Sequence, residues 1–121
     1  MIALLAVLAF AQAAPAGPYP PDPDCQIYGD GSTIAMAECL SAQSDTWERR
    51  LDAAYAAALA SGEVDRVKLR QAQRAWLRYR DANCEMYDAV SGSIHTILAG
   101  TCQRNMTRDR TLELTDMRWT G

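Results

Sequence analysis

The chain has 121 residues, with 15 Asp or Glu against 12 Lys or Arg, so its formal net charge is −3 and its sequence pI is near 5.0. This length suits one domain with a single hydrophobic core. Nucleic-acid binding is disfavoured, because neutralising phosphates requires a concentrated basic face and this sequence has none. A basic protein partner, in contrast, would be attracted electrostatically.

The first 13 residues are predicted to be a secretory signal peptide. An apolar run extends from Ile2 to Ala11, and Ala11-Gln12-Ala13 has the small-x-small pattern of a cleavage site. This run of about ten residues is half the length of about 20 that a membrane-spanning helix needs. We therefore expect a periplasmic or secreted protein with no membrane segment after cleavage. An uncleaved anchor or a different start site is the alternative, because no basic side chain precedes the apolar run.

Residues 14–24 are predicted to be a proline-rich leader that acts as a spacer. Five prolines between positions 15 and 24 favour an extended, polyproline-II-like conformation that contributes nothing to a core. The folded domain is then expected to comprise residues 25–119.

The first predicted helix follows a turn-rich segment and has Ser32 or Thr33 as its N-cap. It is expected to end before Gly62. The sequence does not decide whether the polar stretch 41–46 forms a kink, a break or an exposed turn. Apolar residues recur at helical spacing along one stripe, which comprises Met36, Cys39 or Leu40, Trp47, Leu51, Tyr55 and Leu59.

Two further helices are predicted, over about 65–87 and about 94–117. Ser93 is a candidate cap for the third helix, and an interruption at Gly100 is left open because glycine weakens a helix interior. Strand signals are absent from the sequence. The expected architecture is therefore all-α, a small antiparallel helical bundle.

The second predicted helix carries two aromatic residues three positions apart. Trp76 and Tyr79 therefore share one face, which we expect to lie in the core. Arg74 and Arg78 lie on the opposite face and are expected to contact solvent.

Four cysteines in a short exported chain predict two disulfides. A hairpin of the second and third helices would bring Cys84 close to Cys102, and a short turn-rich segment joins Cys25 to Cys39. We favour these two pairs, with the two crossed connectivities as alternatives. The sequence has no C-x2-C pair, so structural zinc is not expected. No other metal and no cofactor is predicted.

A set of residues at fixed spacing extends from Cys25 to Leu114. These features resemble the lysozyme inhibitor LprI-like domain of bacterial exported proteins, and the central block is the most specific of them. The chain departs from the family at Glu48 and Asp52, near the first shared leucine, and at Ser91-Gly92, where a double glycine is common. The matching residues are Cys25, Cys39, Leu51-Asp52-x-x-Tyr55, the block from Ala72 to Cys84, Gly92-Ser93-Ile94, Cys102 and Thr107-x-x-Arg110-x-x-x-Leu114.

The resemblance implies a small, helical, disulfide-bonded extracytoplasmic domain, of which a named member inhibits lysozyme. We interpret the central motif as structural. Trp76 is expected in the core and Arg80 is expected to bind Glu48 or Asp52 on the first helix, because a guanidinium fork suits a carboxylate across a helix interface. The residues assigned to this structural motif are Gln73, Trp76, Arg80, Thr107 and Arg110.

The connection between the second and third helices is the predicted binding site. It combines carboxylates, hydroxyls, an aromatic ring and the only histidine of the chain in a segment that a bundle would expose. Lysozyme is a basic protein with carboxyl groups in its cleft, so an acidic inhibitor would be steered towards it and a loop could occlude the cleft. An ordinary hairpin connection is the alternative. The candidate residues are Glu85, Tyr87, Asp88, Ser91, Gly92, Ser93 and His95.

Catalysis by this chain is not expected, because His95 is the only histidine and no nucleophile has a recognisable base partner. The alternative function is a non-inhibitory module of the cell envelope that binds another partner through a helix face, for which Arg74 and Arg78 are the candidate residues. The oligomeric state does not follow from the sequence.

Overall fold

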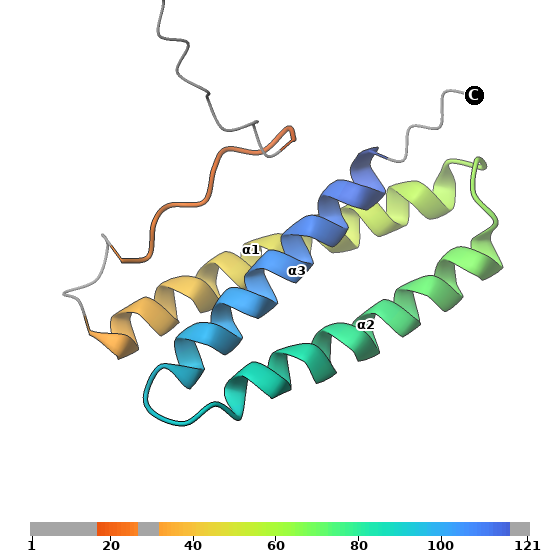
Figure 1. Ribbon diagram of the computed structural model, residues 1–121. Helices are drawn as coiled ribbons and strands as arrows, with labels where there is room; N and C mark the ends of the chain where they lie inside the picture. The colour runs from red at the N-terminus through yellow and green to blue at the C-terminus, as the bar shows by residue number, and fades with distance from the viewer. Residues whose placement is uncertain (1–16, 27–31, 117–121) are drawn as a thin grey trace, which may run out of the picture.

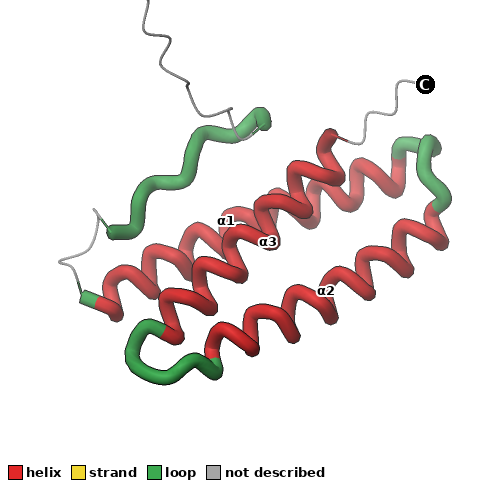
Figure 2. Tube along the Cα trace, viewed as in Figure 1, coloured by secondary structure: helices red, strands yellow, loops and turns green. Residues whose placement is uncertain are grey.

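The computed structural model describes residues 17–26 and 32–116, which form three α-helices and no strand. These are α1 (Thr33–Ala60), α2 (Arg66–Asp88) and α3 (His95–Asp116) (Figure 1). Short connections make consecutive helices antiparallel, and α3 packs against both α1 and α2 (Figure 2). The predicted all-α antiparallel bundle is confirmed. The predicted signal peptide and the expected end of the third helix at position 117 lie outside the described residues.

A capping serine marks the start of helix α1, and a glycine in the left-handed conformation follows its end. The Ser32 hydroxyl accepts a hydrogen bond from the Ala35 N–H at 3.0 Å, which identifies Ser32 as the N-cap. The helix continues through positions 41–46 without a break. Beyond its last turn, Gly62 has a φ of +73°, a left-handed conformation that glycine adopts without the steric penalty of a Cβ atom.

Asp65 caps α2, and its removal provides a test of that boundary. Its carboxylate accepts a hydrogen bond from the Lys68 N–H at 3.0 Å. We expect Asp65→Ala to lower the free energy of unfolding by about 1 kcal/mol in urea denaturation, because an orphan N–H loses its acceptor. Asp65→Asn should keep most of the stability, since asparagine also caps helices. An equal loss in both variants would contradict the capping role.

Helix α3 differs from the sequence prediction at its start, and it resolves the question that was left open at Gly100. It begins at His95, so Ile94 rather than Ser93 directly precedes its first turn. It is also uninterrupted at Gly100, where the absence of a side chain has a packing reason. A Cβ atom at this position would lie 3.2 Å from Cβ of Leu40, so the glycine allows α3 to approach α1 closely.

The two disulfides join the pairs that the sequence analysis favoured. Cys25 is bonded to Cys39 and Cys84 is bonded to Cys102, each with a Cα–Cα distance of 5.5 Å. The first bridge ties the leader to α1, and the second ties the end of α2 to α3. Both bridges therefore hold the end of the bundle at which the α2–α3 connection lies.

The core lies between the three helices, towards the α1–α2 connection. Its buried residues are Leu51, Ala54, Ala58, Leu69 and Leu114, and Trp76 packs partly buried against them. The prediction that Tyr79 shares the core face is wrong, because 62% of this residue is exposed. The reason is geometric: positions three apart differ by 60° around a helix, and only the Trp76 side of α2 faces the other helices.

Over its described part, residues 17–24, the leader is not a free spacer. The Tyr19 ring contacts the Trp47 ring edge to face at 5.2 Å between centroids, and the Trp47 indole N–H donates to the Asp22 carboxylate at 2.9 Å. Burial lowers the pKa of Arg104 on α3, and the nearby Asp22 carboxylate opposes this shift. The leader therefore covers α1 and α3 on the side away from α2 (Figure 1).

Candidate functional site

The structure places the predicted binding residues together at one end of the bundle. Asp88 ends α2 and His95 begins α3, and the His95 Nδ1 atom lies 2.8 Å from the Asp88 Oδ1 atom, which closes the base of the connection. Gly92 lies at the turn with a φ of +88°. The candidate residues Glu85, Tyr87, Asp88, Ser91, Gly92 and Ser93 are all exposed, and His95 is partly exposed.

Exposed apolar side chains lie within this connection and in the last turn of α2. Met86, Val90 and Ile94 are 58%, 43% and 49% exposed, and Tyr87 is 37% exposed. Seven large hydrophobic residues are exposed within the described part of the chain, and these four lie within nine consecutive positions. Sequence reasoning had not counted Met86, Val90 or Ile94 among the candidate binding residues. Exposed apolar residues gathered in one place, bordered by polar groups, are typical of a protein-binding surface.

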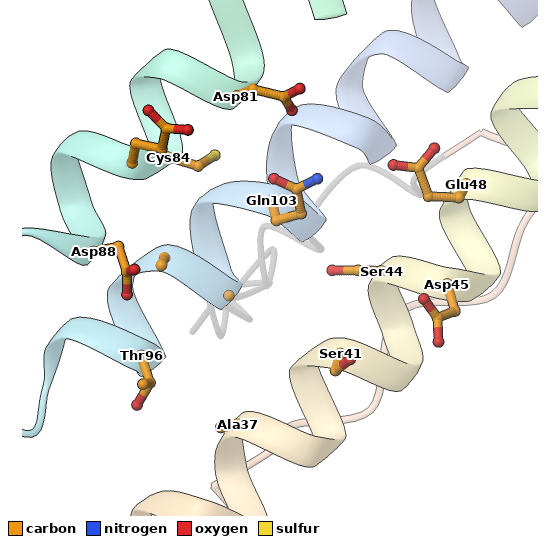
Figure 3. A pocket seen from close by; sticks show the side chains of 13 residues that line it. Ala37, Ser41, Ser44, Asp45, Glu48, Asp81, Cys84, Asp88, Thr96 and Gln103 are labelled. Atoms are coloured by element: carbon orange, nitrogen blue, oxygen red, sulfur yellow. The ribbon is translucent and has the colours of Figure 1, made fainter.

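A groove runs beside this connection, with α1 and α2 as its walls and α3 as its floor (Figure 3). Its volume is about 550 Å³. We call it the acidic groove, because five carboxylate residues line it, two from α1 and three from α2. They are Asp45, Glu48, Asp81, Glu85 and Asp88.

Few positive charges balance the carboxylates of the acidic groove. Arg80 binds both Glu48 and Asp81, the latter at 3.1 Å. Asp88 contacts His95, as described above. Asp45 and Glu85 form no ion pair within residues 17–26 and 32–116. The groove thus has a surplus of negative charge.

Ser44 lies on the α1 wall of the acidic groove and is only 7% exposed. Its hydroxyl has no hydrogen-bond partner among the described residues. All other buried side-chain oxygen and nitrogen atoms of these residues have a partner. Figure 3 shows its oxygen directed from α1 across the groove towards the α3 side. Buried hydroxyl groups are nearly always hydrogen-bonded in folded proteins, so this exception requires an explanation.

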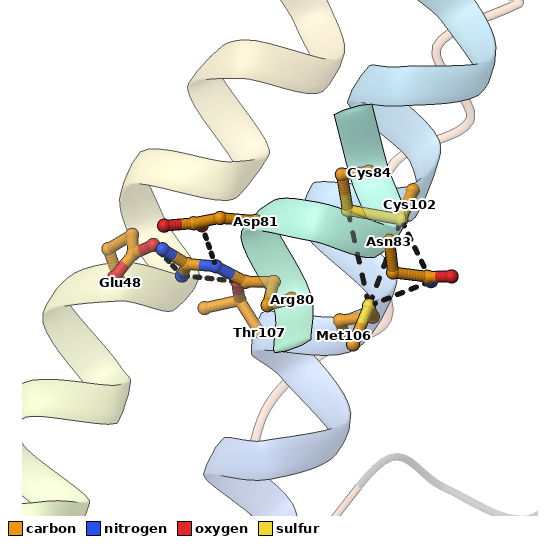
Figure 4. A network of polar contacts seen from close by, with 8 residues as sticks. All are labelled: Glu48, Arg80, Asp81, Asn83, Cys84, Cys102, Met106 and Thr107. Carbon is orange, nitrogen blue, oxygen red and sulfur yellow. Dashed lines mark hydrogen bonds and ion pairs between the residues drawn. A yellow bond between two sulfur atoms is a disulfide. The ribbon is translucent and has the colours of Figure 1, made fainter. Parts of the chain in front are cut away.

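The structural motif of α2 joins all three helices through Arg80 (Figure 4). The Arg80 guanidinium donates to Glu48 on α1 and, at 3.2 Å, to the Thr107 hydroxyl on α3. It also lies over the Trp76 ring at 5.1 Å from the ring centroid. The predicted contact of Arg80 with Glu48 or Asp52 is confirmed, and Glu48 is the partner.

The second arginine of the motif makes a parallel set of contacts nearer the core. The Arg110 Nε atom donates to the Gln73 side-chain carbonyl at 3.0 Å, and its Nη1 atom lies 2.7 Å from the Glu113 carboxylate. Gln73 and Arg110 are both buried. These contacts connect α2 with α3 at buried positions, away from the exposed α2–α3 connection.

Sequence reasoning identified Glu85 and Asp88 as site residues but missed the rest of the acidic groove. Asp45 and Ser44 lie about 40 positions earlier, in a stretch read only as a polar part of α1. Their role depends on α1 and α2 lying on either side of α3, which periodicity does not reveal. No group of three or more His, Cys, Asp or Glu side chains in the described ranges is arranged to hold a metal ion.

The fold and site define a small, disulfide-bonded helical domain with an exposed hairpin and an acidic groove. Residues 25–114 match the family model described as lysozyme inhibitor LprI, and the chain belongs to this family. An uncharacterized protein of Rhizobium meliloti (strain 1021) is 32% identical over 125 residues, covering 86% of this chain and 85% of that protein. No solved structure matches the chain.

The family and the two disulfides suggest an exported protein, because such bridges persist in oxidising compartments. Within the described residues, none of the helices has both the length and the apolar character needed to cross a membrane.

Proposed function

We propose that this protein binds lysozyme and inhibits it by placing the α2–α3 connection in or across the substrate cleft. The observation that carries the proposal is the cluster of exposed apolar residues around this connection, in a chain that belongs to the lysozyme inhibitor LprI family. A protein interface needs a few well-placed apolar or aromatic anchors with polar groups around them. Met86, Tyr87, Val90 and Ile94 supply such anchors here.

The distribution of charge around the connection supports a complex in which residues 89–94 point into the cleft. Residues 89–94 carry no charged side chain, whereas Glu85 and Asp88 lie behind them on α2. The cleft of lysozyme contains two carboxyl groups, so an uncharged tip avoids like-charge repulsion there. Hydroxyls of Ser91 and Ser93 and backbone N–H groups can donate hydrogen bonds to those carboxyl groups. The carboxylates behind the tip then face the basic surface of lysozyme, which favours rapid association.

The proposal is tested by titrating the oxidised chain from Ala14 onwards into chicken-type, goose-type and invertebrate-type lysozymes, with cell-wall hydrolysis and direct binding measured in parallel. We expect one-to-one inhibition of at least one class. Asp88→Lys should weaken inhibition at least about tenfold, because it reverses a charge behind the tip and removes the contact with His95. His95→Ala should also weaken inhibition with little loss of stability.

Asp116→Lys is the matched control, because it makes the same charge change at an exposed position at the far end of α3. It should leave inhibition within about twofold, as expected for a position remote from the interface. Equal losses in the Asp88 and Asp116 variants would show that only net charge matters. Absence of binding to all three classes would contradict the proposal. Loss of another interaction on Arg74→Glu or Arg78→Glu would then support the envelope-module alternative.

A further inference from the structure

We infer that the acidic groove between α1 and α2 binds a guanidinium group, supplied by an arginine side chain of a basic polypeptide. This site is distinct from the exposed tip at residues 89–94, and the inference does not require that the polypeptide be lysozyme. Two independent observations carry it: the unbalanced carboxylates of the groove and the unpartnered hydroxyl of Ser44.

The first observation concerns charge. Five carboxylate residues face a single arginine and a single histidine, and the arginine is already bound to two of them. Carboxylates that line one groove repel one another and together attract cations. A cation entering the groove would relieve this repulsion. Asp45 and Glu85, which form no ion pair among the described residues, line opposite walls of the groove, so their charges remain available to such a cation.

The second observation concerns Ser44. A buried hydroxyl without a partner loses its hydrogen bonds to water and gains none in return, which is unfavourable. The Ser44 oxygen is directed into the groove, one residue before Asp45 on the same wall (Figure 3). A donor group of a ligand in the groove would give this oxygen the hydrogen bond that it lacks. The orphan atom thus marks where the ligand contacts the α1 wall.

A guanidinium fits this arrangement better than a metal ion or an ammonium group does. The carboxylates are spread over two walls, and no three of them are grouped as metal ligands within the described ranges. A guanidinium is planar and has five N–H donors that can reach acceptors in several directions, whereas an ammonium is a compact point charge. Arg80 already shows the match, because its guanidinium binds carboxylates from both walls, Glu48 and Asp81.

The experiment titrates the oxidised chain with a tri-arginine peptide capped at both ends, and follows backbone amide shifts and binding heat at low salt. Peptides of citrulline and of lysine serve as comparisons, because citrulline keeps the shape of arginine without its charge. We expect shifts centred on the groove walls, binding of tri-arginine that weakens with salt, weaker binding of tri-lysine, and none of the citrulline peptide.

Asp45→Asn and Ser44→Ala are the test variants, and neither residue belongs to the tip proposed to enter lysozyme. Each should weaken binding of tri-arginine about three- to tenfold, the value of one hydrogen bond. Glu63→Gln, in the α1–α2 connection at the opposite end of the bundle, is the control and should leave binding unchanged. Equal affinity for tri-lysine, equal losses in all three variants, or shifts outside the groove would each overturn the inference.

Discussion

Replacing Trp47 by alanine is expected to lower the free energy of unfolding by about 4 kcal/mol, the largest effect that we expect from a single substitution. Trp47 is completely buried, and two leader residues, Tyr19 and Asp22, contact its side chain. Its indole ring contacts Tyr19 and lies beneath the guanidinium of Arg50, at 4.5 Å from the ring. Truncation would leave a cavity and remove the contacts that the leader makes with the indole ring. Urea denaturation of the oxidised chain, followed by circular dichroism, measures the loss.

A double-mutant cycle separates the contribution of the leader from that of the cavity. Trp47→Phe keeps an aromatic ring but removes the N–H that donates to Asp22, and Asp22→Ala removes the acceptor. The two substitutions should show a coupling energy of about 1 to 2 kcal/mol, because the bond involves a charged acceptor and is partly buried. Additive effects would mean that the hydrogen bond between the Trp47 N–H and Asp22 does not contribute to stability.

The sequence was sufficient to predict the helices, because apolar residues recur at helical spacing and the helix ends carry capping residues or glycine. It also led to the disulfide pairs, since a short connection between antiparallel helices brings Cys84 to Cys102. The contact of Arg80 with α1 followed from a similar argument. In each case the inference needed local spacing, the chemistry of the side chains and the assumption that adjacent helices pack together.

Other features depend on how the helices are arranged, which local spacing does not specify. Thr107 and Thr111 are fully buried on α3, where a periodicity of apolar residues is not evident. Thr111 satisfies its hydroxyl by donating to the Thr107 carbonyl at 2.8 Å, so a polar residue can occupy a buried position. The docked leader and the α1 wall of the groove escaped prediction for a related reason, since both join segments distant in the sequence.

The second large effect is expected at Arg80, where substitution by methionine should lower the free energy of unfolding by about 3 kcal/mol. The methionine keeps much of the apolar stem but removes every charged hydrogen bond. Glu48 and Asp81 then lose their shared cation, and the buried Thr107 hydroxyl loses its donor. Removing one partner of a buried ion pair costs about 3 to 5 kcal/mol, and we take the lower value because 36% of the Glu48 side chain is exposed.

Arg78→Met is the matched control, because it makes the same chemical change on α2 at an exposed position. It should alter stability by no more than about 0.5 kcal/mol. The double substitution Arg80→Met with Glu48→Leu should recover about half of the loss, since the carboxylate left unpaired on α1 is then also absent. No recovery would show that the cost lies in the contacts with Thr107 and Trp76. Equal effects of Arg78→Met and Arg80→Met would contradict the assignment of Arg80 as the residue that joins the three helices.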